Sequence, residues 1–392
     1  MSASILVPER LSDDVVLIRR DLHMHPELGF EEHRTASIVA SRLRHLGYDV
    51  HEGIGKTGVV GVVRGALPGR TVMLRADMDA LPIAEEGDHP YRSQFEGAMH
   101  ACGHDGHVAI LLGAAALIAD RRDELAGTIC LVFQPAEEGR GGAAAMIADG
   151  LFERFGIERA YGLHLSSKYA TGMLGFREGP MYASSDSIEI EILGVGGHGS
   201  APHDAVDPIC TAAHFITSLQ QIVSRQIDPL EPAVVTIGAI HGGTIHNVIP
   251  RTCKMLGTVR AFSSEVREAM PQRIERILSS CCAASGAEYD FAYFDRYPVT
   301  ANDPEQTRYA RGLAGALVGT ERAIDVTKLM GAEDFSFFAQ RVPACFYTLG
   351  CQSGPSTAHP HHSSLFDIDE RALPTGVAMM TALAFDAPRN AP

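Results

Sequence analysis

The residues best suited to chemistry gather between Ala98 and His107, where three histidines, one cysteine and one aspartate occur within ten residues. An apolar run from Val108 to Ala119, long enough for a helix, follows at once. His100, Cys102 and His104 alternate, so an extended backbone would turn them to one side. A single histidine in a loop, or a single buried cysteine, usually does not bind a metal. Several donor types together favour a transition-metal centre, completed by ligands from elsewhere in the chain.

Two adjacent carboxylates, Glu137 and Glu138, follow the apolar run Thr128–Phe133. An isolated pair of this kind usually makes a solvated helix start. After a buried strand, however, neighbouring side chains point in different directions, so one can bind a metal while the other faces a substrate. We assign Glu138 to the metal and Glu137 to the general base that later acts as acid, and the reverse assignment stays open.

Two further histidine sites could supply ligands. His164 follows the apolar run Ala160–Leu163, where a single histidine is more often a hydrogen-bonded core residue. His359, His361 and His362 follow a loop rich in Gly, Ser and Pro, which could simply be a surface loop. At most one or two of these three need be functional.

Several apolar runs in the first half end in polar residues. Thr71–Ala76 leads into Asp77 and Asp79, and the runs before Glu137 and His164 do the same. Continuous apolar strands separated by helices predict a buried, mainly parallel sheet. Because sites in such sheets form beyond the carboxyl ends of the strands, we expect these ends and the Cys/His stretch to converge.

The pattern changes from about residue 179. Ser187–Leu193 alternates between apolar and acidic residues, and the elements that follow are expected in the order β-α-β-β-α-β, which is that of a ferredoxin-like unit. We therefore predict an α/β fold: a mainly parallel mixed sheet flanked by helices, with an inserted α+β ferredoxin-like domain. Residues 1–178 and 295–392 would form the catalytic, metal-binding domain, and residues 179–294 the inserted domain.

The composition argues against some classes of binding partner and indicates a cellular compartment. The 392 residues carry a formal net charge of −15, which argues against nucleic acid or an anionic membrane surface as the main partner. The eight cysteines show no paired spacing, which favours a reducing compartment. We see neither a signal peptide nor an apolar run of the roughly eighteen residues that a membrane helix needs, and we expect a cytoplasmic protein.

Seven motifs resemble the M20 metallopeptidase superfamily, specifically its amidohydrolase branch of hippurate hydrolases, N-acyl-amino-acid hydrolases (aminoacylases) and auxin-conjugate hydrolases. They span nearly the whole chain in the family's order. The motifs are Leu22-His23-Met24-His25-Pro26-Glu27-Leu28, Arg75-Ala76-Asp77-Met78-Asp79-Ala80-Leu81-Pro82, His100-Ala101-Cys102-Gly103-His104-Asp105-Gly106-His107, Gln134-Pro135-Ala136-Glu137-Glu138, Gly196-Gly197-His198-Gly199-Ser200, Asn247-Val248-Ile249-Pro250 and Gly331-Ala332-Glu333-Asp334-Phe335.

The resemblance implies a zinc-exopeptidase-like catalytic domain that binds two divalent metal ions. The implied ligands are Cys102, His104, Glu138, His164 and a C-terminal histidine, which matches His362, with His361 as the fallback. A thiolate and imidazoles suit Zn²⁺, Mn²⁺, Co²⁺ or Ni²⁺, and the affinity order alone does not choose among them.

Other roles follow from the same resemblance. Asp79 and Asp105 would orient the ligand imidazoles, although both could be ordinary turn residues. His198 would stabilise the oxyanion, reaching over from a partner subunit in similar enzymes. Asn247 and Arg260 would hold the substrate's free carboxylate. The inserted domain would form a homodimer, with a tetramer as the alternative.

The implied activity is hydrolysis of the amide bond of an N-acyl or N-aroyl amino acid, by a metal-activated water with a glutamate base. A dipeptidase or exopeptidase of the same superfamily, and a non-catalytic protein that binds acyl amino acids, are the alternatives. A deaminase-like zinc hydrolase would need a Cys-x-x-Cys motif that this chain lacks. The chain departs from the family at Ser364, where many relatives have Pro, and at Ala332, where they have Gly. Neither residue is a proposed ligand.

Overall fold

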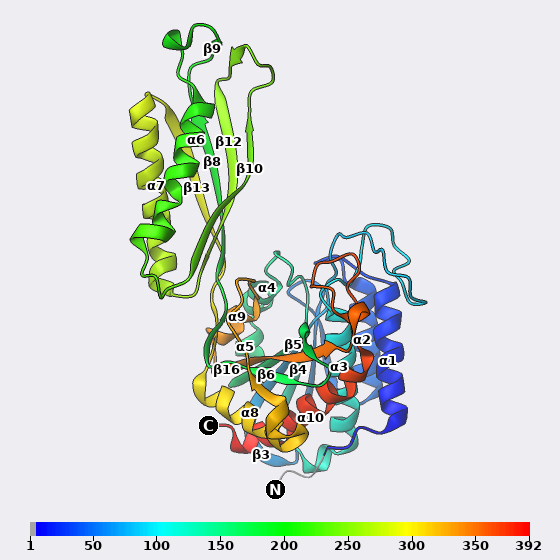
Figure 1. The fold of residues 1–392 in the computed structure, drawn as a ribbon. Coiled ribbons are helices and arrows are strands. Elements are labelled where there is room, and N and C mark those ends of the chain that lie inside the picture. Colours follow the sequence, from blue (N-terminus) through cyan, green and yellow to red (C-terminus); the bar gives the residue numbers. More distant parts are fainter. Residues whose placement is uncertain (1–4) are drawn as a thin grey trace. The chain divides into compact units, whose positions relative to one another are not determined.

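The structure, a computed structural model, describes residues 5–392 and consists of two compact units (Figure 1). The first unit extends to Met181 and resumes at Ala301–Thr327 and Asp334–Pro392, and the second comprises Tyr182–Thr300 and Lys328–Glu333. The expected inserted domain, residues 179–294, lies within a few residues of the main boundaries of the second unit. The short return at Lys328–Glu333 was not expected.

A mixed sheet forms the centre of the first unit. Its four neighbouring strands β4, β3, β5 and β16 are parallel, whereas β1 and β2 join antiparallel at one edge. The predicted mainly parallel mixed sheet is confirmed. In spatial order the described strands are β1 (Asp49–Ile54), β2 (Gly58–Arg64), β4 (Ala126–Gln134), β3 (Leu67–Asp77), β5 (Arg159–Ala170), β16 (Ala344–Gln352), β6 (Leu174–Phe176) and β15 (Ala323–Asp325).

Helices flank this sheet. The helix α3 is apolar all round, is buried from His104 to Ala115, and packs between α1 and α10. A helix that is hydrophobic on every side belongs in the interior, so α3 offers a rigid support for whatever its first turn carries. The helices of this unit are α1 (Glu9–Met24), α2 (His33–His45), α3 (His104–Asp120), α4 (Gly142–Ala148), α5 (Leu151–Phe155), α8 (Pro304–Val318), α9 (Phe335–Ala339) and α10 (Leu373–Asn390).

The second unit is the predicted ferredoxin-like fold. Its antiparallel sheet has the order β10-β12-β8-β13, and α6 and α7 pack against it around a core of its own. Its elements are β8 (Ser185–Leu193), β9 (Gly197–His198), α6 (Pro208–Leu219), β10 (Ala233–Gly242), β11 (Val248–Ile249), β12 (Thr252–Ala261), α7 (Ser264–Ser285) and β13 (Glu288–Tyr297). The short strands β7 (Gly179–Tyr182) and β14 (Thr300–Asn302) lie where the chain passes between the units.

None of the helices in residues 5–392 is both long enough and apolar enough to cross a membrane.

Candidate metal centre

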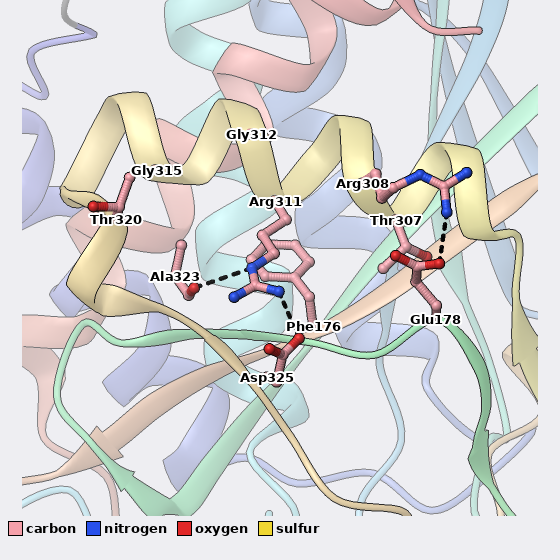
Figure 2. A pocket seen from close by; sticks show the side chains of 10 residues that line it. All are labelled: Phe176, Glu178, Thr307, Arg308, Arg311, Gly312, Gly315, Thr320, Ala323 and Asp325. Atoms are coloured by element: carbon pink, nitrogen blue, oxygen red, sulfur yellow. Dashed lines mark hydrogen bonds and ion pairs between the residues drawn. The ribbon is translucent and has the colours of Figure 1, made fainter.

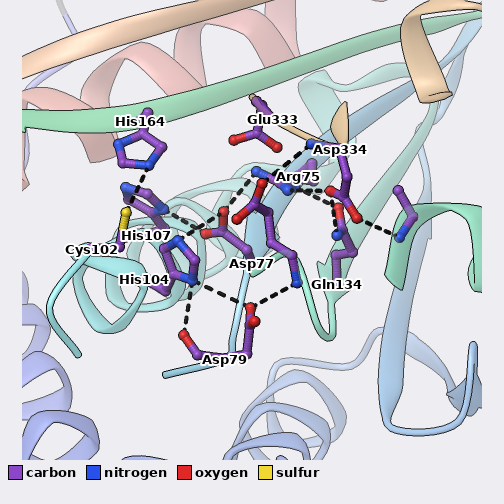
Figure 3. Close-up of polar contacts among 12 residues, drawn as sticks. Arg75, Asp77, Asp79, Cys102, His104, His107, Gln134, His164, Glu333 and Asp334 are labelled. Carbon is purple, nitrogen blue, oxygen red and sulfur yellow. Dashed lines mark hydrogen bonds and ion pairs between the residues drawn. The ribbon is translucent and has the colours of Figure 1, made fainter. Parts of the chain in front are cut away.

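The carboxyl ends of two parallel strands carry polar side chains, as the sequence predicts, whereas the third strand, β5, continues past its predicted end to Ala170. Asp77 ends β3 and Gln134 ends β4, and the two are paired in register, while His164 lies in β5. The buried Arg75 donates to Gln134 Oε1 at 2.8 Å and to Asp77 Oδ2 at 2.8 Å, and it also pairs with Asp334 at 3.1 Å. The Arg75 guanidinium thus joins the ends of β3 and β4 to Asp334 (Figure 3).

The expected extended backbone through His100, Cys102 and His104 is wrong. Gly103 has a left-handed conformation, with φ of +88°, and α3 already begins at His104. Glycine tolerates such a φ without a steric penalty, which permits the abrupt turn. As a result Cys102 lies in the turn and His104 in the first turn of a buried helix. His100 is not among the metal-type donors grouped around Cys102.

Two groups of donors share Cys102. One comprises Cys102, His104 and Glu138, and the other Cys102, His164 and His361; within each group the donor atoms lie within 4.8 Å of one another. The Cys102 sulfur is 3.4 Å from His164 Nε2 and 3.8 Å from His361 Nδ1. Two overlapping groups around one sulfur fit a pair of neighbouring cations.

Both histidines of the C-terminal pair reach this cluster. His362 Nε2 lies 3.1 Å from Glu138 Oε1, and the His362 amide donates to the Ala101 carbonyl at 2.8 Å. His362 has a φ of +65°, an uncommon value for a non-glycine residue. The structure thus groups four of the five predicted ligands, Cys102, His104, Glu138 and His164, around the sulfur together with His361, the fallback. His362 lies against Glu138 but outside both groups.

Two of the predicted ligand imidazoles are oriented through their second nitrogens. His104 Nδ1 lies 2.8 Å from the Asp79 carbonyl oxygen and His164 Nδ1 lies 2.6 Å from the Leu165 carbonyl oxygen. In each case a hydrogen bond from Nδ1 leaves Nε2 for a metal. Within residues 5–392, His104 Nε2 is a buried atom without a hydrogen-bond partner. A cation would satisfy it, so the donor set fits metal ions.

The histidine pKa values differ between the two donor groups. Burial lowers the pKa of His164 well below its usual value and that of His361 to about 3, and neighbouring imidazoles add to the effect. Both rings are therefore neutral at neutral pH, the form that binds metals. Burial alone would lower the pKa of His104 too, but the carboxylates of Asp77 and Asp79 outweigh it and raise that pKa to about 10.

Burial raises the pKa of the Cys102 thiol well above its usual value, and the nearby carboxylates of Glu138 and Glu137 raise it further. Without a cation the sulfur is therefore protonated. Burial would also raise the pKa of Glu138, but His362 and His104 lower it overall. The cluster holds its carboxylate ionised and its thiol neutral, and a metal ion would have to displace the thiol proton.

Asp79 organises the two glutamates as well as His104. Its carboxylate oxygens accept hydrogen bonds from the Glu137 amide at 3.0 Å and the Glu138 amide at 2.9 Å, and one oxygen lies 3.3 Å from His104 Nδ1. Ala136, just before the pair, has a φ of +51°. The side chains then diverge: Glu138 joins the donor group, while Glu137 Oε1 accepts from the Asp334 amide at 3.2 Å.

Asp105 does not contact a predicted ligand. Its Oδ2 lies 2.8 Å from both Arg19 Nε and His23 Nδ1, so the expectation that it orients a ligand imidazole needs correction. The reason is the helix start: Asp105 lies one residue into α3, and its side chain turns toward α1. Asp77 contacts His104 instead, at 3.4 Å.

His107 was not assigned a role, and its contacts explain why it is not a free ligand. Its Nδ1 lies 2.5 Å from Asp77 Oδ1, and its Nε2 accepts from the Leu165 amide at 2.9 Å. Both nitrogens are thus occupied, and the ring supports β5 beside the ligand His164. Asp77 and His107 thus form a supporting pair. The only sequence signal for this pair is the alternation of Asp77 and Asp79 after an apolar strand.

The remaining predicted residues belong to the second unit. His198 is exposed on β9, with Nδ1 2.8 Å from Ser200 Oγ, and the carbonyl oxygen of the exposed Asn247 accepts from the Gly199 amide at 2.8 Å. Asn247 lies shortly before the start of β12 at Thr252, whereas Arg260 lies near the end of this strand. At about 3.3 Å per strand residue, Arg260 is roughly 25 Å from Thr252. One small carboxylate cannot contact Asn247 and Arg260 of the same chain.

A separate pocket of about 340 Å³ opens between α8, β6 and β15 (Figure 2). It holds two ion pairs, Arg308 with Glu178 at 2.7 Å and Arg311 with Asp325 at 2.6 Å. None of the predicted site residues lines it. Because both guanidinium groups already have carboxylate partners, the pocket presents no unpaired arginine to an anionic ligand.

Comparison with known proteins agrees with this geometry. Residues 73–386 match peptidase family M20/M25/M40. A hippurate hydrolase from Campylobacter jejuni is 44% identical over 345 residues, which cover 87% of this chain and 89% of the relative. Thermostable carboxypeptidase 2 from Saccharolobus solfataricus is 42% identical over 381 residues, which cover 96% of each protein.

Solved structures are similar over the full length. The YXEP protein of Bacillus subtilis, described as a dinuclear metal binding peptidase from the M20 family, matches with a TM-score of 0.84 and 33% identity. The match covers 97% of this chain and 99% of that one.

Proposed function

The chain belongs to peptidase family M20/M25/M40, in its amidohydrolase branch, and on that basis we propose that it hydrolyses the amide bond of N-acyl or N-aroyl amino acids. The products are a carboxylic acid and a free amino acid. The observation that carries the proposal is the pair of donor groups that share Cys102, with Glu137 beside them but outside both.

We propose that Cys102, His104, Glu138, His164 and His362 hold two divalent ions. The close approach of His361 to Cys102 supports it as an additional or alternative ligand in the group with His164. When bound, such ions lower the pKa of a water molecule and polarise an amide carbonyl. The donor set admits Zn²⁺, Mn²⁺, Co²⁺ and Ni²⁺.

Glu137 moves the protons in this scheme. Its carboxylate is buried, 6% exposed, and is tethered at Oε1 by the Asp334 amide. A carboxylate held in this way can accept the proton of the attacking water and pass it to the departing amine nitrogen, which would otherwise leave as an unstable anion. Asp79 fixes the Glu137 backbone and so aims the carboxylate.

The second unit would supply substrate contacts. The spacing of roughly 25 Å along β12 means that Arg260 and the pair His198 and Asn247 can meet one substrate only if they come from different copies of the chain. We therefore infer a homodimer in which one copy contributes Arg260 and the other His198. His198 would donate to the developing oxyanion, and Arg260 would bind the substrate carboxylate in a bidentate manner.

The sharpest test is Glu137→Gln. The variant removes the base but no ligand, so it should keep its metal content while hydrolysis of benzoyl-glycine falls about 10²- to 10⁴-fold, the usual contribution of a general base. Metal per chain and kcat are the measurements. Glu124→Gln, an exposed substitution, is the matched control and should keep full activity. Full turnover by Glu137→Gln would refute the role.

The substrate class needs its own comparison. The relative named hippurate hydrolase and the one named carboxypeptidase differ in their stated activity, so benzoyl, acetyl, indolylacetyl and long-chain acyl amino acids should be compared with free dipeptides, using each metal. Faster hydrolysis of the free dipeptides would favour the exopeptidase alternative. Activity that a chelator abolishes and added metal restores would dismiss the non-catalytic binding protein.

A further inference from the structure

A second group of metal-type donors lies outside the proposed centre. It consists of His23, at the end of α1, with Glu85 and His89 from the segment between β3 and α3; their donor atoms lie within 4.8 Å of one another. His23 Nε2 is 3.2 Å from Glu85 Oε1, and His89 Nε2 is 2.7 Å from the same oxygen. Two imidazole nitrogens and one carboxylate oxygen therefore point to a common place.

The other atoms of these side chains are already engaged, which orients the donors. His23 Nδ1 lies 2.8 Å from the buried carboxylate of Asp105, the arrangement that backs many metal-binding histidines. The second oxygen of Glu85 accepts from the Ser93 amide at 2.7 Å. His89 is held by stacking on Tyr91, with ring centroids 4.1 Å apart. The three donor atoms are thus held close to one another without any contribution from the proposed centre.

Within residues 5–392, neither a lysine nor an arginine forms an ion pair with the Glu85 carboxylate. Glu85 is 5% exposed, and its only ion-pair partners within residues 5–392 are the two imidazoles. Arg19, the nearest buried guanidinium of the network, pairs instead with Asp105, Asp367 and Glu370. Burial and Arg19 would lower the pKa of His23, but Asp105 and Glu85 raise it overall. Burial would raise the pKa of Glu85, but His23 and His89 lower it to about 2. Glu85 is therefore an ionised oxygen donor, and a metal ion would have to displace the proton that His23 holds between the two carboxylates.

Neighbouring atoms are also unsatisfied. His100 is 2% exposed and its ring centroid is 6.3 Å from that of His23, yet neither of its nitrogens has a hydrogen-bond partner among the residues described. The same is true of His89 Nδ1. Buried polar atoms without partners usually indicate a water or an ion at the site, and water ligands of a metal ion would supply them.

We propose that His23, Glu85 and His89 bind a further divalent metal ion, of the Zn²⁺ type, in addition to those of the Cys102 centre. Two histidines and one glutamate are a set that zinc uses with a water in the fourth position. Because His23 is part of α1 and the other two ligands belong to residues 78–103, the ion fastens that segment to the helix. Residues 78–103 include Cys102 and end where α3 begins. The ion therefore also restrains the segment that carries this predicted ligand.

The test counts ions. The full-length protein is stripped with a chelator, reloaded with excess Zn²⁺, freed of unbound metal by gel filtration and analysed for zinc per chain. His89→Phe keeps an aromatic ring against Tyr91 but removes a donor, and we expect it to hold one ion fewer than the wild type. Glu85→Gln is the second variant and should show the same loss. His51→Phe, the same substitution at a histidine that pairs with Asp49 and lies against Phe155, is the control and should hold the wild-type number.

The readout is a difference, so it does not depend on how many ions the Cys102 centre holds or on whether the proposed hydrolysis is right. Zinc should also protect residues 78–103 against limited proteolysis in the wild type and in His51→Phe, but not in His89→Phe. If His89→Phe and Glu85→Gln are folded by circular dichroism and still bind as many zinc ions as the wild type, the proposal is wrong.

Discussion

At the scale of single residues, two of the predicted metal ligands, Cys102 and His104, hold protons that a metal ion must displace. The pKa of Cys102 is raised by burial and nearby carboxylates, and Asp77 and Asp79 raise that of His104 to about 10 against the effect of burial. At neutral pH both groups are therefore protonated when no ion is bound. Only the thiolate and the neutral imidazole are ligands, so protons and metal ions compete for the same two atoms.

This competition predicts a steep pH dependence of metal affinity. Raised pKa values mean that the free protein keeps both protons up to high pH, so affinity should rise with pH and fall as pH falls. Two protons released correspond to roughly a 100-fold change in affinity per pH unit. Zinc dissociation constants from competition with a chelator between pH 6 and pH 8 would measure the slope. Cys130→Ser, at a buried thiol of β4 outside the donor groups, should leave the slope unchanged, and a flat profile in the wild type would contradict the assignment.

The family resemblance supplied the predicted ligand set, but it does not show how neighbouring residues share the donor positions. A sequence cannot tell that His361 and His362 both reach the cluster, because that depends on the left-handed φ of His362. Nor does it show that Asp105, which belongs to the same motif as His104, points away from that histidine toward Arg19 and His23. That outcome depends on the direction in which the Asp105 side chain leaves the first turn of α3.

At the scale of elements, the runs that are strongly apolar were predictable and the polar ones were not. The strands β3, β4 and β5 are buried on both faces and were found from composition. The edge strand β1 has the sequence Asp-Val-His-Glu-Gly-Ile and is largely exposed, so no periodicity marked it as a strand. The start of α3 at His104 could not be seen either, because it depends on the conformation of Gly103.

A short helix near the C-terminus offers a test at the same scale. Asp369 caps η6 (Glu370–Ala372), accepting from the Arg371 amide, and it also accepts from Thr171 Oγ1 at 2.6 Å just beyond β5. Burial would raise the pKa of Asp369, but the Arg371 and Thr171 hydrogen bonds lower it overall to about 2. A carboxylate with a lowered pKa stabilises the fold above its unfolded pKa of about 4, and that contribution is lost as pH falls through about 2.

We expect Asp369→Ala to lower the free energy of unfolding by about 1 kcal/mol at pH 7, the usual cost of losing a cap. The difference from the wild type should shrink as pH falls from 4 to 3, because Asp369 of the unfolded chain takes up its proton in that range, while the folded carboxylate stays ionised until about pH 2. Urea unfolding at pH 7, 4 and 3 would measure it. Asp88→Ala, at an exposed position, should show no such trend. A difference that stays constant with pH would show that Asp369 acts through packing alone.

At the scale of the whole molecule, the two units have separate hydrophobic cores. The core of the first surrounds α3 and includes Leu111, whereas Phe215 of α6 lies in the core of the second. Both proposed groups of metal ligands belong to the first unit. A ligand stabilises only the folding unit that binds it, so metal ions should act on one core and not on the other.

Calorimetry should therefore resolve two unfolding transitions, of which metal ions raise the melting temperature of one only. Phe215→Ala removes a fully buried ring at a cost of about 3–5 kcal/mol and should lower the metal-independent transition, by roughly 10 °C or more for a unit of this size. Leu111→Ala is the matched variant and should lower the metal-dependent transition. Because each variant affects one core, the two assignments check each other. A single transition that shifts with metal in both variants would mean that the two units unfold as one.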